Sequence, residues 1–351
     1  MNTVKIGGRQ IGPGKPVYIV AEAGVNHDGD VVAARRLVDA AREAGADAVK
    51  FQVFRADALV SASAPTCAYQ REGPGAPENQ REMLRRLELR REALVELQQH
   101  AAAAGIDFLA TPFGLAELRF LVDELRVPAI KIASTDLVNV PLLSAAGLSS
   151  VPTIVSTGAA TLDEVDAAVA VMRRCRAEQR LILLHCVSAY PAPLAAARLR
   201  CIGALARRFD LPTGFSDHTR ETLTGALAVA AGAVVLEKHL TLDRGAAGPD
   251  HGFSLEPDQL REYVRGVRRA EQMLGDGQIG FLAEEAEVRA LARGRLVACR
   301  TIPAGAALDA AAIVVQRPGD GIDPSRWDEV IGRIAGVEIP ASTPLAWTML
   351  R

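Results

Sequence analysis

Short apolar runs alternate with longer amphipathic segments over the first 275 residues of the chain. Each amphipathic segment places apolar residues at i, i+3, i+4 and i+7, which is the spacing of one helix face. The runs between them have the length of buried strands, at residues 17–22, 48–52, 107–111, 129–134, 153–157, 181–186, 213–217 and 234–240. Strands that alternate with helices in this number predict an α/β fold, a closed (β/α)8 TIM barrel.

An open doubly wound sheet is the alternative architecture. Its glycine fingerprint GxGxxG should follow the first strand, but the chain reads AEAGVNHDG there, which favours the barrel. The segment from Val53 to Ala76 contains Pro and Gly and is predicted to be a long loop after the second strand. On a barrel this loop lies on the catalytic face, so it is a candidate lid.

The pattern changes after residue 275. Residues 276–292 are predicted to be a linker with some helical character. Residues 293–351 contain short apolar runs, a glycine turn and the loop RPGDGI, which predicts a small, mostly β domain. We therefore expect a catalytic domain at 1–275 and a second domain too short for catalysis of its own.

Composition and charge exclude several classes of function. A formal net charge of −2 provides no field for binding nucleic acid or an anionic membrane, and no apolar run is long enough to span a bilayer. The five cysteines are scattered without a CxxC pair, which suits free thiols in a reducing compartment. We expect a cytoplasmic enzyme or binding protein without a secretion signal.

Nearly every predicted strand ends in polar or ionisable residues, whereas an ordinary buried parallel strand is apolar throughout. Because strand ends converge at one mouth of a barrel, these side chains are expected to form a single site. They are Glu22, Lys50, Gln52, Thr111, Lys131, Ser134, Ser156, Thr157, His185, Ser188, Tyr190, Ser216, Asp217, His218, Glu237, Lys238 and His239.

Two lysines on different strands, Lys50 and Lys131, indicate a site for a compact anion such as a phosphate with or without a carboxylate. Ser134, Ser156 and Ser216 are neighbouring hydrogen-bond donors. The structural alternative is that each lysine pairs with a strand-end carboxylate, such as Glu22 or Glu237.

His218 and His239 follow neighbouring strands and can meet at the mouth. Two imidazoles with oxygen ligands suit a divalent metal such as Mn²⁺, Fe²⁺, Co²⁺ or Zn²⁺, with Asp217 and Glu237 nearby. His27 is expected to hold the first loop, and His185 to bond the backbone. Asp250, in the string GPDHGFSLEP, either holds substrate hydroxyls, transfers a proton or forms an Asx turn.

With these residues the chain resembles the N-acetylneuraminate (sialic acid) synthase family. The matching strings are AEAGVNHDG, AGADAVKFQ, GIDFLATPF, KIAS, STGAATLDE, LLHCVSAYPAP, GFSDHT, EKHLTLDR and GPDH with SLEP, in the family's order. The tail strings IVVQRPGDGI and WDEVIGR resemble its antifreeze-like (SAF) domain. The resemblance covers nearly the whole chain.

The resemblance implies condensation of phosphoenolpyruvate, an N-acylated amino sugar and water with release of phosphate. It implies a divalent metal, Mn²⁺ first with Co²⁺, Mg²⁺ or Fe²⁺ as alternatives, and a domain-swapped homodimer. The implied roles are catalysis for Glu22, Lys50, Lys131 and Asp250, and metal binding for His218 and His239. The implied substrate-binding residues are Gln52, Thr111, Ser134, Ser156, Ser188, Tyr190, Ser216, Glu237 and, from the other subunit, Arg317.

Three departures from the family's pattern, Thr135, Val187 and Ser188, leave open whether the sugar is N-acetylmannosamine or a diacetamido-trideoxyhexose. Ser188 resembles the legionaminate-type relatives. A metal-dependent hydrolase is a second enzyme class, but its HxH on the first strand is absent. A carbohydrate- or ice-binding protein is the non-enzyme alternative, which charged groups at every strand end disfavour.

Overall fold

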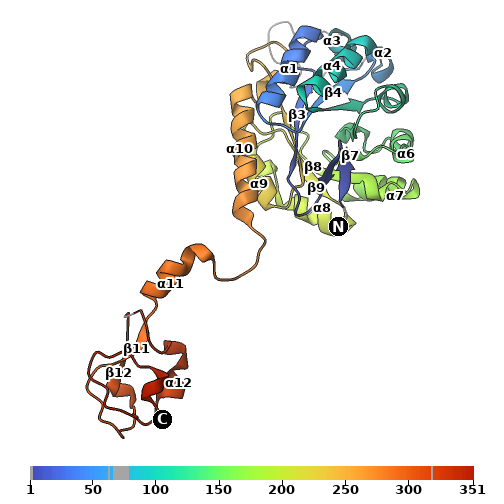
Figure 1. Ribbon diagram of the computed structural model, residues 1–351. Coiled ribbons are helices and arrows are strands. Elements are labelled where there is room, and N and C mark those ends of the chain that lie inside the picture. Colours follow the sequence, from blue (N-terminus) through green and yellow to red (C-terminus); the bar gives the residue numbers. More distant parts are fainter. Residues whose placement is uncertain (1–2, 62–63, 66–78, 318) are drawn as a thin grey trace. The chain divides into compact units, whose positions relative to one another are not determined.

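The computed structural model describes residues 3–61, 64–65, 79–317 and 319–351 (Figure 1). The chain divides into two compact units, Met1–Gly275 and Asp276–Arg351. Part of the predicted lid, residues 62–63 and 66–76, lies outside the described residues. Ala56–Leu59, within the same predicted loop, is the short helix α2.

The first unit is a closed barrel of eight parallel strands, in the order β10-β3-β4-β5-β6-β7-β8-β9, as predicted. Every strand expected from the apolar runs is present. The strands are β3 (Tyr18–Gly24), β4 (Ala48–Val53), β5 (Asp107–Pro112), β6 (Ile130–Ile132), β7 (Thr153–Ser156), β8 (Leu181–Cys186), β9 (Thr213–Asp217) and β10 (Val235–His239).

Helices surround the barrel (Figure 1) and bury the apolar faces that the sequence periodicity predicts. They are α1 (Val31–Glu43), α3 (Gln80–Leu87), α4 (Arg91–Ala104), α5 (Leu115–Arg119), α6 (Val140–Leu148), α7 (Leu162–Arg174), α8 (Arg200–Phe209), α9 (Leu223–Ala230) and α10 (Pro257–Leu274). Helix α4 stops at Gly105, whose φ of 74° is left-handed and favours glycine.

A hairpin that the sequence pattern did not predict closes the amino-terminal end of the barrel. Strands β1 (Val4–Ile6) and β2 (Arg9–Ile11) pair across Gly7 and Gly8, which both have positive φ. Val4, Ile6 and Ile11 join the apolar cluster inside the barrel, with Tyr18, Val20, Leu109, Ile154, Ile182 and Leu184 among its members. Apolar packing therefore fills this end, and the polar strand ends occupy the opposite one.

The second unit has its own small core. It contains α11 (Ala286–Ala292), the antiparallel pair β11 (Arg295–Ala298) and β12 (Ile313–Gln316), and α12 (Trp327–Val330). The apolar side chains of this core include Leu296, Leu308, Ile322, Val330 and Leu345. The small domain with short strands is thus present. Among the described residues, no helix is long and apolar enough to cross a membrane.

Candidate active site

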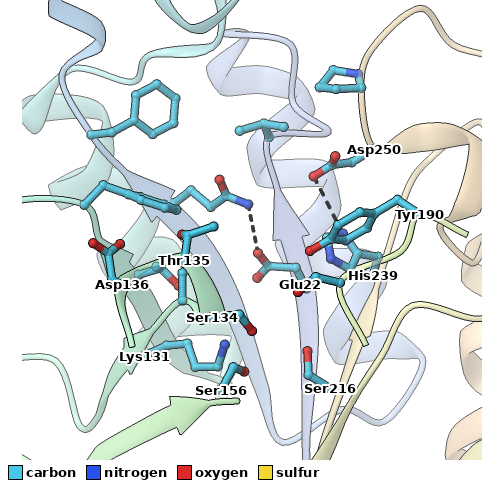
Figure 2. Close-up of a pocket in the computed structure, with 18 of the residues that line it drawn as sticks. Glu22, Lys131, Ser134, Thr135, Asp136, Ser156, Tyr190, Ser216, His239 and Asp250 are labelled. Carbon is cyan, nitrogen blue, oxygen red and sulfur yellow. Dashed lines mark hydrogen bonds and ion pairs between the residues drawn. The ribbon is translucent and has the colours of Figure 1, made fainter. Parts of the chain in front are cut away.

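A cavity of about 710 Å³ opens at the carboxyl ends of the barrel strands. It brings together every residue to which the family resemblance gives a role, except Arg317: Glu22, Lys50, Gln52, Thr111, Lys131, Ser134, Ser156, Ser188, Tyr190, Ser216, His218, Glu237, His239 and Asp250. Arg317 follows β12 in the second unit and is exposed. Figure 2 shows Glu22 in the middle of the cavity, between Lys131 and Ser134 on one side and His239 and Asp250 on the other.

The floor of the cavity carries two lysines and two glutamates, all almost completely buried. Lys50 Nζ lies 3.1 Å from Glu22 Oε2 and 3.5 Å from Glu237 Oε2. Lys131 Nζ lies 3.3 Å from Glu237 Oε1. Both lysines therefore pair with strand-end carboxylates, which was the alternative to an anion site. These pairs form the floor of the cavity.

Burial and neighbouring charge shift these groups in different directions. Burial lowers the pKa of Lys131 and raises the pKa of Glu22, with the Glu237 charge adding to the second effect. Burial acts to raise the pKa of Glu237, but the Lys131 and Lys50 charges outweigh it and lower that pKa strongly. Glu237 is thus the ionised partner, and Glu22 is the carboxyl whose surroundings favour the protonated form.

Hydroxyl groups surround the lysines on the other strands. Thr111 Oγ1 accepts from Lys50 Nζ at 2.9 Å, and Ser216 Oγ donates to Glu237 Oε1 at 2.9 Å. Ser156 Oγ and Ser188 Oγ are buried and have no hydrogen-bond partner among the described residues. Because an unpaired buried polar group is costly, these hydroxyls indicate a polar ligand in the cavity.

The loop after β7 brings the backbone of Gly158 next to the hydroxyls of Ser134 and Ser188. Gly158 N donates to Ser134 Oγ at 2.9 Å. A Cβ at this position would lie 2.4 Å from Ser188 Oγ and 2.8 Å from Ser134 Oγ. Only glycine fits here without displacing the hydroxyls.

The two predicted metal ligands meet at the wall of the cavity, where the rings of His218 and His239 have centroids 5.3 Å apart. His218 Nδ1 bonds Val187 O at 2.8 Å. His239 Nδ1 is buried without a hydrogen-bond partner among the described residues, and Asp250 Oδ2 lies 3.8 Å away. Burial, then the His218 charge, hold the pKa of His239 well below its usual value, so this ring is neutral.

This donor set fits a divalent cation, because neutral imidazole and carboxylate oxygen are ligands of Mn²⁺, Fe²⁺ and Co²⁺. Among the described residues, no group of three or more His, Cys, Asp or Glu side chains forms a complete metal site. The candidate protein donors are the two rings, and a cation held by them would need oxygen ligands from elsewhere to fill its coordination. Burial, then the Glu22 charge, raise the pKa of Asp250 to about 7.

Asp217 and Lys238 do not contribute to the cavity, contrary to expectation. Successive side chains of a strand point to opposite faces, and these two point outward, where they pair with each other at 2.9 Å. His185 bonds Ala197 O and His27 accepts from Gly29 N, so both are structural as predicted. His251 pairs with Asp28 at 3.1 Å and ties two loops of the mouth together.

Sequence reasoning missed an apolar wall on one side of the mouth. Phe54 and Phe113 follow β4 and β5 directly, and their rings pack edge to face at 6.2 Å. The rest of this apolar wall is Val25, Leu59, Val60, Met83, Leu84 and Leu87. Helix α3 is mostly polar in sequence, but Met83 and Leu87 lie one turn apart on its buried face, which is the only signal that could have found them.

Comparison with known proteins gives a consistent result. Residues 37–279 match the model of the NeuB family, and residues 295–351 match that of the SAF domain. The chain is 39% identical to the N,N'-diacetyllegionaminic acid synthase of Legionella pneumophila, over 94% of this chain and 93% of that protein. It is 38% identical to the synthase of the same name from Campylobacter jejuni, over 92% and 96%.

A solved structure is similar over most of the molecule. The N-acetylneuraminic acid (sialic acid) synthetase of Leptospira borgpetersenii, in complex with citrate, superposes with a TM-score of 0.73 at 35% identity. The match covers 82% of this chain and 95% of that one.

Proposed function

The chain belongs to the NeuB family, and we propose that it condenses phosphoenolpyruvate with an N-acylated amino sugar and water to form a nonulosonic acid and phosphate. The observation that carries this proposal is the cavity floor, where Lys50 and Lys131 lie among unpaired hydroxyls beside two facing histidines. The hydrolase and the carbohydrate-binding alternatives find no support in the comparisons.

Phosphoenolpyruvate is proposed to bind over Lys50 and Lys131. Its phosphate and carboxylate need cationic partners, and the ammonium groups of the two lysines in the cavity supply them. Ser156, Ser188, Ser134 and Thr111 supply hydroxyl donors. The glutamates keep Lys50 charged before the substrate arrives, since the Glu22 and Glu237 charges outweigh burial and raise the pKa of Lys50.

Synthases of this family depend on a metal ion, and we propose Mn²⁺ held by His218 and His239. A divalent cation there would polarise the aldehyde oxygen of the open-chain sugar. The chain's own groups do the rest. Asp250 holds a sugar hydroxyl and exchanges a proton with it, and Tyr190 and Gln52 orient the sugar from either side. Attack by the methylene carbon forms the new C–C bond, the aldehyde oxygen takes up a proton, and the phosphate-bearing carbon gains cationic character. Glu22 stabilises this carbon and takes the proton of the water that adds to it. The C–O bond to phosphate then breaks, so that phosphate leaves and the ketone forms.

A phosphate-release assay tests the reaction. Phosphate should appear only when phosphoenolpyruvate, an N-acylated amino sugar and Mn²⁺ are all present, and mass spectrometry should find the condensed acid. His218→Ala and His239→Ala should lose both turnover and bound metal. Release of phosphate without the sugar, or full activity of either variant, would contradict the proposal.

The apolar wall bears on the identity of the sugar. The two lysines lie on the floor with Glu22 and Glu237, and apart from this floor and the two histidines the acidic or basic side chains along the described lining are Asp136 and Asp250. A second phosphate, carried by the sugar, would face these acids and the apolar wall without a counter-charge. A methyl group at the sugar's far end would instead bury against Phe54, Met83 and Leu84. We therefore propose a diacetamido-trideoxyhexose as the acceptor.

Competition among acceptors tests this preference. The trideoxy sugar should exceed N-acetylmannosamine in kcat/KM by about 100-fold, the usual scale on which an apolar pocket discriminates against an added hydroxyl. N-Acetylmannosamine 6-phosphate should be the poorest substrate. Leu84→Arg should improve use of the phosphorylated sugar, whereas Leu148→Arg, on an exposed helix position of α6, should not. A wild-type preference for the phosphorylated sugar would contradict the assignment while leaving the reaction class intact.

A further inference from the structure

Asp217 and Lys238 form a buried ion pair that the proposed reaction does not use. They are partners across β9 and β10, with Lys238 Nζ 2.9 Å from Asp217 Oδ2 and side chains 1% and 0% exposed. Both point outward from the barrel toward α10, where the ring of Tyr263 lies 5.5 Å from the ammonium group. Their chain neighbours His218 and His239 face the cavity.

The ion pair holds the backbone that carries His218. Asp217 Oδ1 accepts from Thr219 N at 2.9 Å, which closes a turn around His218. Lys238 Nζ donates to Thr219 O at 2.5 Å, so the same residue is bound to β10. Thr224 Oγ1 donates to Asp217 and anchors the carboxylate to α9. The peptide groups on both sides of Thr219 are therefore fixed from outside the barrel.

Stability alone gives little reason for this arrangement. Removing two charges from water costs several kcal/mol per ion, and apolar residues of similar size are often equally stable in such places. The pair does, however, join β9, which His218 follows, to β10, which ends in His239, and each member of the pair lies one residue before a histidine.

We propose that Asp217 and Lys238 are positioning residues, which set His218 relative to His239 so that both rings bind one metal ion. This inference rests on the proposed metal role of the two histidines. The pair acts through the backbone of Thr219 and touches neither the metal nor the substrates.

The test is Mn²⁺ binding to the full-length, metal-free protein, measured by calorimetry and by the electron paramagnetic resonance signal of free Mn²⁺. Asp217→Asn and Lys238→Met should weaken Mn²⁺ binding by about 10- to 100-fold, the usual effect of removing a group that orients metal ligands. Leu236→Ala is the matched control, because Leu236 lies on the same outward face of β10 and is buried. It should lower thermal stability and leave Mn²⁺ affinity unchanged.

A double variant, Asp217→Leu with Lys238→Met, keeps the inference testable if either single variant fails to fold. It removes both buried charges and should fold, yet still bind Mn²⁺ weakly. Wild-type Mn²⁺ affinity in any folded variant of the pair would overturn the inference, provided that His239→Ala has lost binding. Binding that survives His239→Ala would instead overturn the metal assignment, and the inference with it.

Discussion

Asp250 is the residue whose ionisation the fold opposes most clearly. Its carboxyl is buried beside Glu22, and its pKa rises from 3.8 to about 7. Between these values the unfolded chain releases the proton and the native protein retains it. The free energy of unfolding therefore falls as the pH rises from 4 to 7, and the loss is complete above the native pKa.

Asp250→Asn should remove this dependence. The difference in the free energy of unfolding, variant minus wild type, should rise by about 3 kcal/mol from pH 5 to pH 8. This value follows from about 1.36 kcal/mol per pKa unit. Urea unfolding of both metal-free proteins at the two pH values measures the difference. The same variant should be nearly inactive at either pH, because the amide cannot take a proton. A stability difference that does not change with pH would show that Asp250 titrates normally.

At the scale of the element, the loop that joins β7 to α7 delivers Gly158 to two cavity hydroxyls. Gly158→Ala should push Ser134 and Ser188 apart and raise KM for phosphoenolpyruvate by about tenfold, equivalent to 1.4 kcal/mol of binding energy. Gly266→Ala, in α10 with open space around it, is the control and should leave the kinetics unchanged. Steady-state kinetics with the sugar saturating separates the two outcomes, and equal KM values would argue against a phosphoenolpyruvate site at this loop.

Strand length and strand alternation determine which elements and site residues the sequence predicts. Continuous apolar runs such as residues 181–184 predicted the strands correctly, because a strand that is buried on both faces is apolar at successive positions. The hairpin Val4–Ile11 was not predicted, because each of its strands has three residues, too few to show the alternation of apolar and polar positions. Convergence of strand ends predicted the cavity. The prediction was wrong for Asp217 and Lys238, because successive side chains of a strand point to opposite faces and these two point away from the mouth.

At the scale of the whole molecule, the two units have separate apolar cores, and the first residues of the second unit, ahead of its core, expose Ile279, Phe281 and Leu282. The predicted domain-swapped homodimer would bring Arg317 of one subunit to the sugar in the barrel of the other.

Mixing two inactive variants tests that arrangement. His239→Ala disables the barrel, and Arg317→Ala disables the contribution of the second unit. In a swapped dimer, a mixed pair combines the intact barrel of one chain with the intact Arg317 of the other, which restores one complete site. Random exchange of subunits makes half of the dimers mixed, so activity should recover to about a quarter of the wild-type value. If Arg317 instead serves the barrel of its own chain, every site in the mixture keeps one defect, and no activity returns although tagged chains show that mixed dimers have formed.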